Sequence, residues 1–163
     1  MQPNLYLGVG DIPQTFLASF LIWFFLGIVA LIFYRGDGKT RRMIALSIVS
    51  GIFAWVISLI VKDIIPNVPR PFKINGYPPL TITIPGNASF PSNHTALAFG
   101  VASYVLLKNR KLGLFLLILA TLIGLGRIVG NVHFLIDVVG GAILGIFSSL
   151  LVDTLQTSLR KRR

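Results

Sequence analysis

The chain has 163 residues, of which 54% are hydrophobic and only 12% are charged, and its mean hydropathy is +0.80. A water-soluble domain carries about twice that share of charged residues, so the composition excludes a soluble enzyme. It predicts one all-α domain over residues 1–163, built as a polytopic transmembrane helix bundle. The formal net charge of +10 would suggest a nucleic-acid partner in a soluble protein, but here the basic residues flank apolar segments, and no nucleic acid is expected.

Five apolar segments are candidates for membrane spans. In chain order they lie at about 15–34, 43–61, 91–107, 112–129 and 138–155. The third is the shortest, because about 17 residues rise only about 25 Å as a helix. We therefore expect the end that carries His94 to lie below the headgroup plane, within reach of a lipid headgroup.

The basic residues cluster after the first, third and fifth segments. Eleven of the 15 do so, namely Arg35, Lys39, Arg41, Arg42, Lys108, Arg110, Lys111 and 160–163. Because such clusters stay in the cytoplasm, the carboxyl terminus is predicted inside and the amino terminus outside. The basic residues that break this pattern are Lys62, Arg70, Lys73 and Arg127, and we expect a functional reason for their position.

A proline-rich stretch separates the second and third segments. Six of the nine prolines lie within 62–90, which predicts an extracytoplasmic loop, 62–92, without sustained helix. The alternation of residues 80–84 fits either a short strand or an edge lying on the membrane surface. Ser89 or Ser92, beside Pro91, supplies the helix-start chemistry of the next segment. Ser92, Asn93 and His94 would then occupy its first turn, where free N–H groups can bind phosphate.

The second polar cluster is Gly126-Arg127, His133 and Asp137. Asp137 lies four positions after His133, so on a helix a carboxylate can hold one imidazole nitrogen and leave the other free to attack. An arginine inside an apolar stretch is costly and is usually paired or functional. Either histidine alone would be read as an ordinary hydrogen-bonded residue, and Lys62 alone fits a snorkelling lysine; together they favour a phosphate site.

These residues resemble the type 2 phosphatidic acid phosphatase superfamily. Its signatures are Lys, six residues and Arg-Pro; then Pro-Ser-Gly-His; then Ser-Arg, five residues, His, three residues and Asp. The corresponding residues are Lys62 with Arg70-Pro71, Pro91-Ser92-Asn93-His94, and Gly126-Arg127 with His133 and Asp137. The resemblance covers 62–137 and has three departures. Seven residues separate Lys62 from Arg70, Asn93 replaces a glycine, and Gly126 replaces a serine.

The resemblance implies a mechanism without metal or cofactor. His133 would be the nucleophile that forms a phosphohistidine, Asp137 would orient its ring, and His94 would protonate the leaving oxygen. Arg70 and Arg127 would clamp the phosphate through bidentate hydrogen bonds. The phosphate would also be bound by the Ser92 hydroxyl and the N–H groups near Asn93. Because the spacing before Arg70 differs by one residue, the lysine that assists would be Lys62 or Lys73. Water would be the acceptor in the second step.

The sequence thus predicts an enzyme that hydrolyses a lipid phosphate or diphosphate on the outer side of a bacterial plasma membrane. Undecaprenyl diphosphate is the first substrate predicted, because the Phe90-Pro91-Ser92-Asn93-His94 variant resembles the bacterial undecaprenyl-diphosphate phosphatases of this superfamily. Phosphatidic acid, phosphatidylglycerophosphate and lipid A phosphate are alternative substrates. A lipid phosphotransferase, or a small transporter that uses His133 and Asp137 as a proton relay, remains the alternative of another class.

Overall fold

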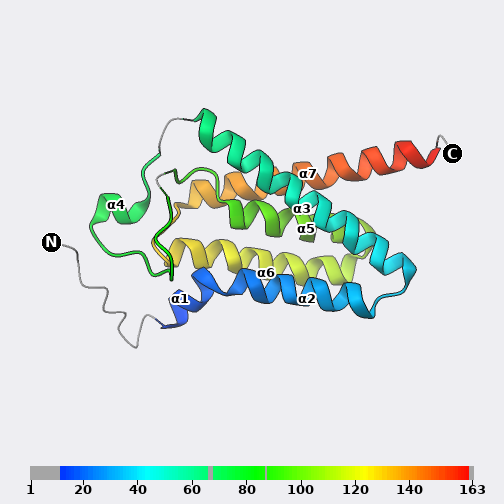
Figure 1. The fold of residues 1–163 in the computed structure, drawn as a ribbon, viewed down its shortest axis with the longest axis horizontal. Coiled ribbons are helices and arrows are strands. Elements are labelled where there is room, and N and C mark those ends of the chain that lie inside the picture. Colours follow the sequence, from blue (N-terminus) through cyan, green and yellow to red (C-terminus); the bar gives the residue numbers. More distant parts are fainter. Residues whose placement is uncertain (1–11, 66–67, 87, 162–163) are drawn as a thin grey trace.

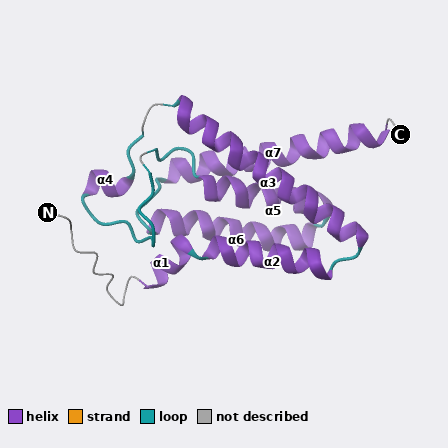
Figure 2. Ribbon diagram, in the orientation of Figure 1, coloured by secondary structure: helices purple, strands orange, loops and turns teal. Residues whose placement is uncertain are grey.

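The computed structural model describes residues 12–65, 68–86 and 88–161, and these ranges form seven helices and no strand (Figure 2). The helices are α1 (Ile12–Ser19), α2 (Leu21–Arg35), α3 (Gly38–Ile64), α4 (Pro71–Asn75), α5 (Asn93–Lys108), α6 (Arg110–Val129) and α7 (Leu135–Lys161). The predicted all-helical class is confirmed over the described residues. The amino terminus, predicted outside, lies beyond the described residues.

The long helices run side by side and α5 lies at their centre (Figure 1). It packs against α3, α6 and α7, and most of its residues are buried. Small residues permit this close packing, since a Cβ on Gly100 would lie 2.9 Å from Gly51 Cα of α3. A Cβ on Gly145 of α7 would lie 2.6 Å from the Gly100 backbone nitrogen. Small residues allow helix backbones to approach one another in membrane proteins.

Short polar caps turn the chain at the end of the bundle away from α4. Asp37 is the N-cap of α3, and its carboxylate accepts a hydrogen bond from the Thr40 N–H at 2.8 Å. Asn109 is the single residue between α5 and α6, and its side chain accepts from the Leu112 N–H at 3.1 Å. Such caps satisfy N–H groups that a helix start leaves unpaired. They bring the basic ends of α2, α3, α5, α6 and α7 to one end of the molecule (Figure 1).

The outer surface is apolar, as expected of an integral membrane protein. Large exposed side chains include Trp23, Phe24, Ile118, Ile143 and Phe147. Three helices, α3, α6 and α7, are long and apolar enough to cross a membrane, and the bent pair α1–α2 would be a fourth if it forms one span. The 16 residues of α5 rise only about 24 Å, less than the roughly 30 Å of bilayer hydrocarbon. Five full crossings are therefore not confirmed, although each of the five predicted segments is helical.

The polar loop is more structured than predicted. The helix α3 extends to Ile64 and contains Lys62, and α4 forms directly after Arg70, with Pro71 as its first residue. A proline is tolerated there because the first helical N–H needs no intrahelical partner. Residues 80–84 form no strand; the Leu80 N–H instead donates to the Gly130 carbonyl at 2.9 Å. The first predicted span is also not one straight helix, because α1 and α2 meet at an angle of 49°.

Candidate active site

The predicted polar residues meet at the end of the bundle that carries α4. This end is formed by the last turn of α3, the first turn of α5, the loop before α5 and the α6–α7 turn (Figure 1). The loop is tied to that turn through Asn131, whose φ of 58° lies in the left-handed region that asparagine tolerates. The Asn131 amide donates to the Tyr77 carbonyl at 3.0 Å, and Asn75 donates to Asn131 Oδ1 at 2.8 Å.

His133 and Asp137 form the predicted pair. His133 lies two residues before α7 rather than on it, yet its Nδ1 is 3.2 Å from Asp137 Oδ2. The two side chains are 3% and 0% exposed. Because a carboxylate only accepts hydrogen bonds, this contact assigns the proton to Nδ1 and leaves the lone pair of the ring on Nε2. The pair thus has the geometry of an oriented imidazole nucleophile.

Ser89 belongs to this cluster, although the sequence suggested for it only a helix-start role. Its hydroxyl donates to Asp137 Oδ2 and lies 3.5 Å from His133 Nδ1. The Phe134 N–H donates to the same carboxylate oxygen at 2.8 Å. Three donors therefore fix one oxygen of Asp137. No local pattern signals the Ser89 contact, because 48 residues separate Ser89 from Asp137.

Arg70 connects the loop to the nucleophile. It is 5% exposed, and its guanidinium donates to the carbonyls of Gly86 at 2.5 Å, Ala88 at 2.9 Å and Val132 at 2.8 Å. The Arg70 Nη1 atom also lies 3.2 Å from His133 Nε2. Arg70 therefore lies beside Nε2 of His133, and its hydrogen bonds organise the backbone around that nitrogen.

Arg127 is held by the first helix. It lies in the last turn of α6, is 7% exposed, and donates from Nη1 to the Ala18 carbonyl of α1. Its Nε is buried without a hydrogen-bond partner among the described residues. The preceding Gly126 is required by the same packing, because a Cβ there would lie 2.5 Å from the Leu17 carbonyl oxygen. The replacement of the family's serine by Gly126 thus accommodates α1.

The motif at the start of α5 faces the same cluster. Ser92 is the N-cap of α5, and its N–H donates to the Asp137 carbonyl at 2.9 Å. Its buried hydroxyl makes no capping bond and accepts from Thr95 Oγ1 at 3.0 Å. Asn93 and His94 occupy the first turn, as expected. The Asn93 amide lies 3.0 Å from the Ser58 hydroxyl of α3, so the residue that replaces the family's glycine joins α5 to α3.

The two candidate lysines differ in position. Lys62, on the last turn of α3, interacts electrostatically with Arg70, Arg127 and Asp137. The helical continuation of α3 thus brings Lys62 to the cluster despite the extra residue before Arg70. Lys73 lies exposed on the short helix α4.

Burial and the nearby cations favour the neutral form of His133. Burial, together with the charges of Arg70, Arg127 and Lys62, lowers the pKa of His133 from 6.5 to about 4, although its hydrogen bond to Asp137 acts in the opposite direction. A neutral imidazole is the form that can attack phosphorus. The charges of Arg127, Arg70 and Lys62 also act on His94, which lies on α5. The cluster combines a histidine oriented by a carboxylate, a second histidine and three cations.

Two curated relatives resemble this chain in sequence. "Bacitracin transport permease protein BcrC" of Bacillus licheniformis is 33% identical over 138 residues, which cover 84% of this chain and 67% of the relative. "Undecaprenyl-diphosphatase BcrC" of Bacillus subtilis (strain 168) is 29% identical over 150 residues, which cover 92% of this chain and 77% of the relative.

Two crystal structures share the fold. LpxE of Aquifex aeolicus matches with a TM-score of 0.68 at 26% identity, over 94% of this chain and 88% of that one. A PAP2-type phosphatidylglycerolphosphate phosphatase from Bacillus subtilis matches with a TM-score of 0.63 at 24% identity, over 99% of this chain and 82% of that one. The model of the PAP2 superfamily matches residues 42–160, which include every predicted site residue. The resemblance noted in the motifs is thereby confirmed, and this chain belongs to the PAP2 superfamily.

Proposed function

We propose that this protein removes the terminal phosphate of a lipid diphosphate, converting undecaprenyl diphosphate to undecaprenyl phosphate. Its class, a phosphate ester hydrolase, follows from membership of the PAP2 superfamily. The choice of substrate is supported by the Bacillus subtilis relative, which is named an undecaprenyl-diphosphatase. Phosphatidic acid, phosphatidylglycerophosphate and lipid A phosphate are the competing substrates of the same reaction class.

The observation that carries this proposal is the position of the His133 ring. Its Nδ1 lies 3.2 Å from Asp137 Oδ2, and its Nε2 lies 3.2 Å from Arg70 Nη1. A phosphoryl group that reaches Nε2 therefore meets a guanidinium donor at the same place. A proton relay would need the pair of His133 and Asp137, but it would not need two buried arginines beside it.

In the first step, the lone pair of His133 Nε2 attacks the terminal phosphorus. The bond from phosphorus to the bridging oxygen breaks, and His94 donates a proton to that oxygen as the lipid monophosphate leaves. Asp137 accepts a hydrogen bond from Nδ1 and stabilises the positive ring. Arg70 and Arg127 bind the phosphoryl oxygens, and the buried Nε of Arg127, without a partner among the described residues, gains one.

In the second step, water attacks the phosphohistidine. The bond between phosphorus and Nε2 breaks, inorganic phosphate leaves, and His94 accepts the proton of the water. Lys62 and the N–H groups at the start of α5 add positive potential around the phosphate, as helix N-termini do for anions. The fixed cations supply the charge stabilisation that a divalent metal supplies in other phosphatases, so activity in EDTA is expected.

The proposal includes a membrane arrangement. The chain would cross the plasma membrane of a bacterium five times, with the short α5 as the third crossing and the amino terminus outside. The basic ends of the helices would lie in the cytoplasm, and the site, at the opposite end of the bundle, would face the outer side. Supporting this, most basic residues outside the site lie at the end away from α4.

The test is phosphate release by purified protein in detergent with EDTA. Wild type and His133→Ala are assayed in parallel on undecaprenyl diphosphate, phosphatidic acid and phosphatidylglycerophosphate. We expect the fastest release from undecaprenyl diphosphate, and a loss of at least 1000-fold in kcat/KM in the variant, because loss of the nucleophile removes the covalent path. Denatured wild type quenched during turnover should carry acid-labile phosphate that the variant lacks.

The matched control is Ile136→Ala, which removes a 63% exposed side chain next to Asp137 and should retain activity. Phosphate release by His133→Ala at the wild-type rate would contradict the mechanism for every substrate. Faster release from phosphatidic acid or phosphatidylglycerophosphate would instead correct the substrate. An added alcohol that captures phosphate in place of water would identify a phosphotransferase.

A further inference from the structure

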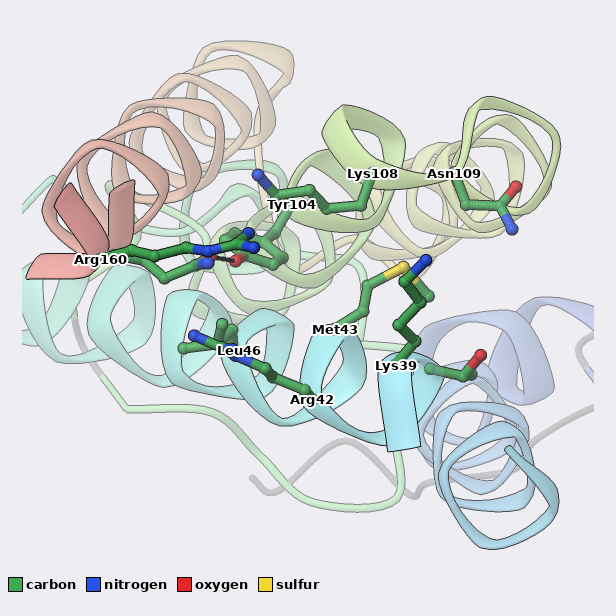
Figure 3. A pocket seen from close by; sticks show the side chains of 10 residues that line it. Lys39, Arg42, Met43, Leu46, Tyr104, Lys108, Asn109 and Arg160 are labelled. Atoms are coloured by element: carbon green, nitrogen blue, oxygen red, sulfur yellow. Dashed lines mark hydrogen bonds between the residues drawn. The ribbon is translucent and has the colours of Figure 1, made fainter. Parts of the chain in front are cut away.

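A polar cavity lies at the end of the bundle away from the candidate active site, and Figure 3 shows it from close by. It has a volume of about 430 Å³ and is lined by residues of α3, α5 and α7. Four of its side chains are cations, namely Lys39, Arg42, Lys108 and Arg160. The 16 residues of α5 lie between the catalytic end and Lys108, which separates the two places by about 24 Å along the helix.

The positive charge of this cavity is largely uncompensated. Among the described residues, only Lys108 of the four cations forms an ion pair, with Asp153 of α7. No carboxylate of the described chain lines the cavity. The Asp37 carboxylate, at the same end, accepts from the Thr40 N–H as the cap of α3. Lys39 interacts electrostatically with this carboxylate, whereas Arg42 and Arg160 form no ion pair among the described residues. The cavity therefore carries more positive than negative charge, which favours the binding of an anion.

The uncharged groups of the cavity also favour an acceptor-rich ligand. Tyr104 is fully buried, and its hydroxyl donates to Gln156 Oε1 at 2.5 Å. The Asn109 Oδ1 atom accepts from the Leu112 N–H at 3.1 Å. The side-chain oxygens of Gln156 and Asn109 thus already accept hydrogen bonds, and the NH2 groups of the same amides remain as donors for a ligand. Cations and N–H donors around one cavity are the complement of a phosphate.

We infer that this cavity binds the phosphate group of an anionic ligand, carried either by a phospholipid of the adjacent leaflet or by a water-soluble phosphate ester. Basic pockets between transmembrane helices are a known way of holding anionic lipid headgroups. The general excess of cations at cytoplasmic ends explains why Lys and Arg occur here. It does not explain why Arg42 and Arg160, from separate helices, line the same cavity as two amide donors.

The test is thermal unfolding of the full chain in uncharged detergent. The probes are phosphatidylglycerol, its deacylated headgroup glycerophosphoglycerol, and zwitterionic phosphatidylcholine. The first two are phosphodiesters without a terminal phosphate, so the catalytic centre does not consume them. The variant Arg42→Gln/Arg160→Gln is compared with Arg35→Gln/Lys111→Gln. The control pair removes the same charge from exposed residues of the same clusters that do not line the cavity.

We expect a phosphodiester to raise the Tm of wild type and of the control pair at the same concentrations. In Arg42→Gln/Arg160→Gln the apparent Kd should be at least tenfold weaker. An equal response to the soluble headgroup and to the lipid would identify a water-soluble ester as the ligand, and a response to the lipid alone would identify a membrane lipid. Equal weakening in both pairs, a similar response to phosphatidylcholine, or no response in wild type would overturn the inference.

A second measurement tests the inference with single variants, in case the double variant folds poorly. Native mass spectrometry of wild type, Lys39→Gln and Arg35→Gln counts the phosphatidylglycerol molecules that each retains. Lys39 lines the cavity and is exposed, so its replacement should leave the fold intact and reduce the retained lipid relative to Arg35→Gln. Equal retention by the two single variants would overturn the inference as well.

Discussion

The residues around His133 are joined mainly by contacts between distant parts of the chain. The spacing of His133 and Asp137 predicted their contact, because four residues span one helical turn. The Ser89 contact to Asp137 and the three carbonyls bound by Arg70 were not predictable in this way. They depend on how the proline-rich loop folds over the α6–α7 turn, and a loop without periodicity gives no register for such contacts.

Ser89 is expected to be a positioning residue. Its hydroxyl donates to the oxygen of Asp137 that faces His133 Nδ1. Ser89→Ala should lower kcat about tenfold or more with little change in KM, because a hydrogen bond to a charged group contributes about 1.5–3 kcal/mol. Steady-state kinetics on undecaprenyl diphosphate measures both constants.

Two further variants separate positioning from general destabilisation. Ser89→Thr keeps the hydroxyl and should recover most of kcat. Ser148→Ala removes a buried hydroxyl of α7 that has no partner among the described residues, and it should leave kcat unchanged. A loss in Ser148→Ala as large as that in Ser89→Ala would argue against the proposed role.

The pKa of His133 predicts how stability depends on pH. Burial lowers this pKa from 6.5 to about 4 in the folded protein. Below pH 6.5 the unfolded chain binds a proton that the folded chain does not, so the free energy of unfolding should fall as the pH drops from 6.5 to 4. Between pH 7 and 4.5, the Tm of wild type should fall more than that of His133→Asn by about 5 °C or more.

Wild type and His133→Asn both contain His94, so any contribution of His94 is common to the two proteins and cancels in the comparison. Scanning fluorimetry in detergent at several pH values gives the two Tm curves, and Trp23 and Trp55 provide the signal. Parallel curves for wild type and His133→Asn would show that His133 is not held neutral by burial.

At the scale of elements, α1 provides part of the site. Its Ala18 carbonyl accepts from Arg127, and its Leu17 carbonyl covers the position of Gly126. Hydropathy predicted a single straight span over 15–34, because apolar character reports burial in lipid but not where a helix bends. The bend between α1 and α2 and the short α4 follow from tertiary contacts and from a proline placed at a helix start.

The fit of α1 against α6 predicts opposite effects for two glycine substitutions. In an exposed helix interior, Gly→Ala stabilises by about 1 kcal/mol. Gly27→Ala on α2 meets no atom within 4 Å and should raise or maintain the Tm. Gly126→Ala places a Cβ 2.5 Å from the Leu17 carbonyl; it should destabilise by about 1–3 kcal/mol and reduce phosphate release by displacing the partner of Arg127.

Thermal unfolding and phosphate release of the two variants test this prediction together. Equal Tm values for Gly126→Ala and Gly27→Ala would mean that α1 can shift away from the added methyl group without a loss of stability. In that case the packing of α1 would not explain why Gly126 replaces the serine of the family motif.

At the scale of the whole molecule, the long apolar segments of the chain predicted where the long helices lie, but the predicted number of five crossings is not confirmed. The central helix α5 is nearly enclosed by α3, α6 and α7 and is only 16 residues long. A helix in that position need not reach both surfaces, because its neighbours shield its ends from lipid. The depth of His94 below the headgroup plane stays a prediction, and the short α5 is the feature on which it rests.

The proposed orientation can be tested directly because the chain contains no cysteine. Single cysteines are placed at Ile74, which is 65% exposed on α4, and at Ser158, which is exposed near the end of α7. A membrane-impermeant maleimide added to intact cells should label Ile74→Cys but not Ser158→Cys. Disrupted cells should label both, which verifies that each thiol is accessible.

Activity of the two cysteine variants confirms that both proteins are folded before labelling is compared. Label on Ser158→Cys alone would place the catalytic end in the cytoplasm and contradict the positive-inside reasoning. Label on both in intact cells would place the two ends of the bundle on the same side, which an odd number of crossings between α4 and the end of α7 forbids. The expected pattern requires an odd number of crossings after α4. Because α6 and α7 are two candidate spans, the short α5 would have to be the third.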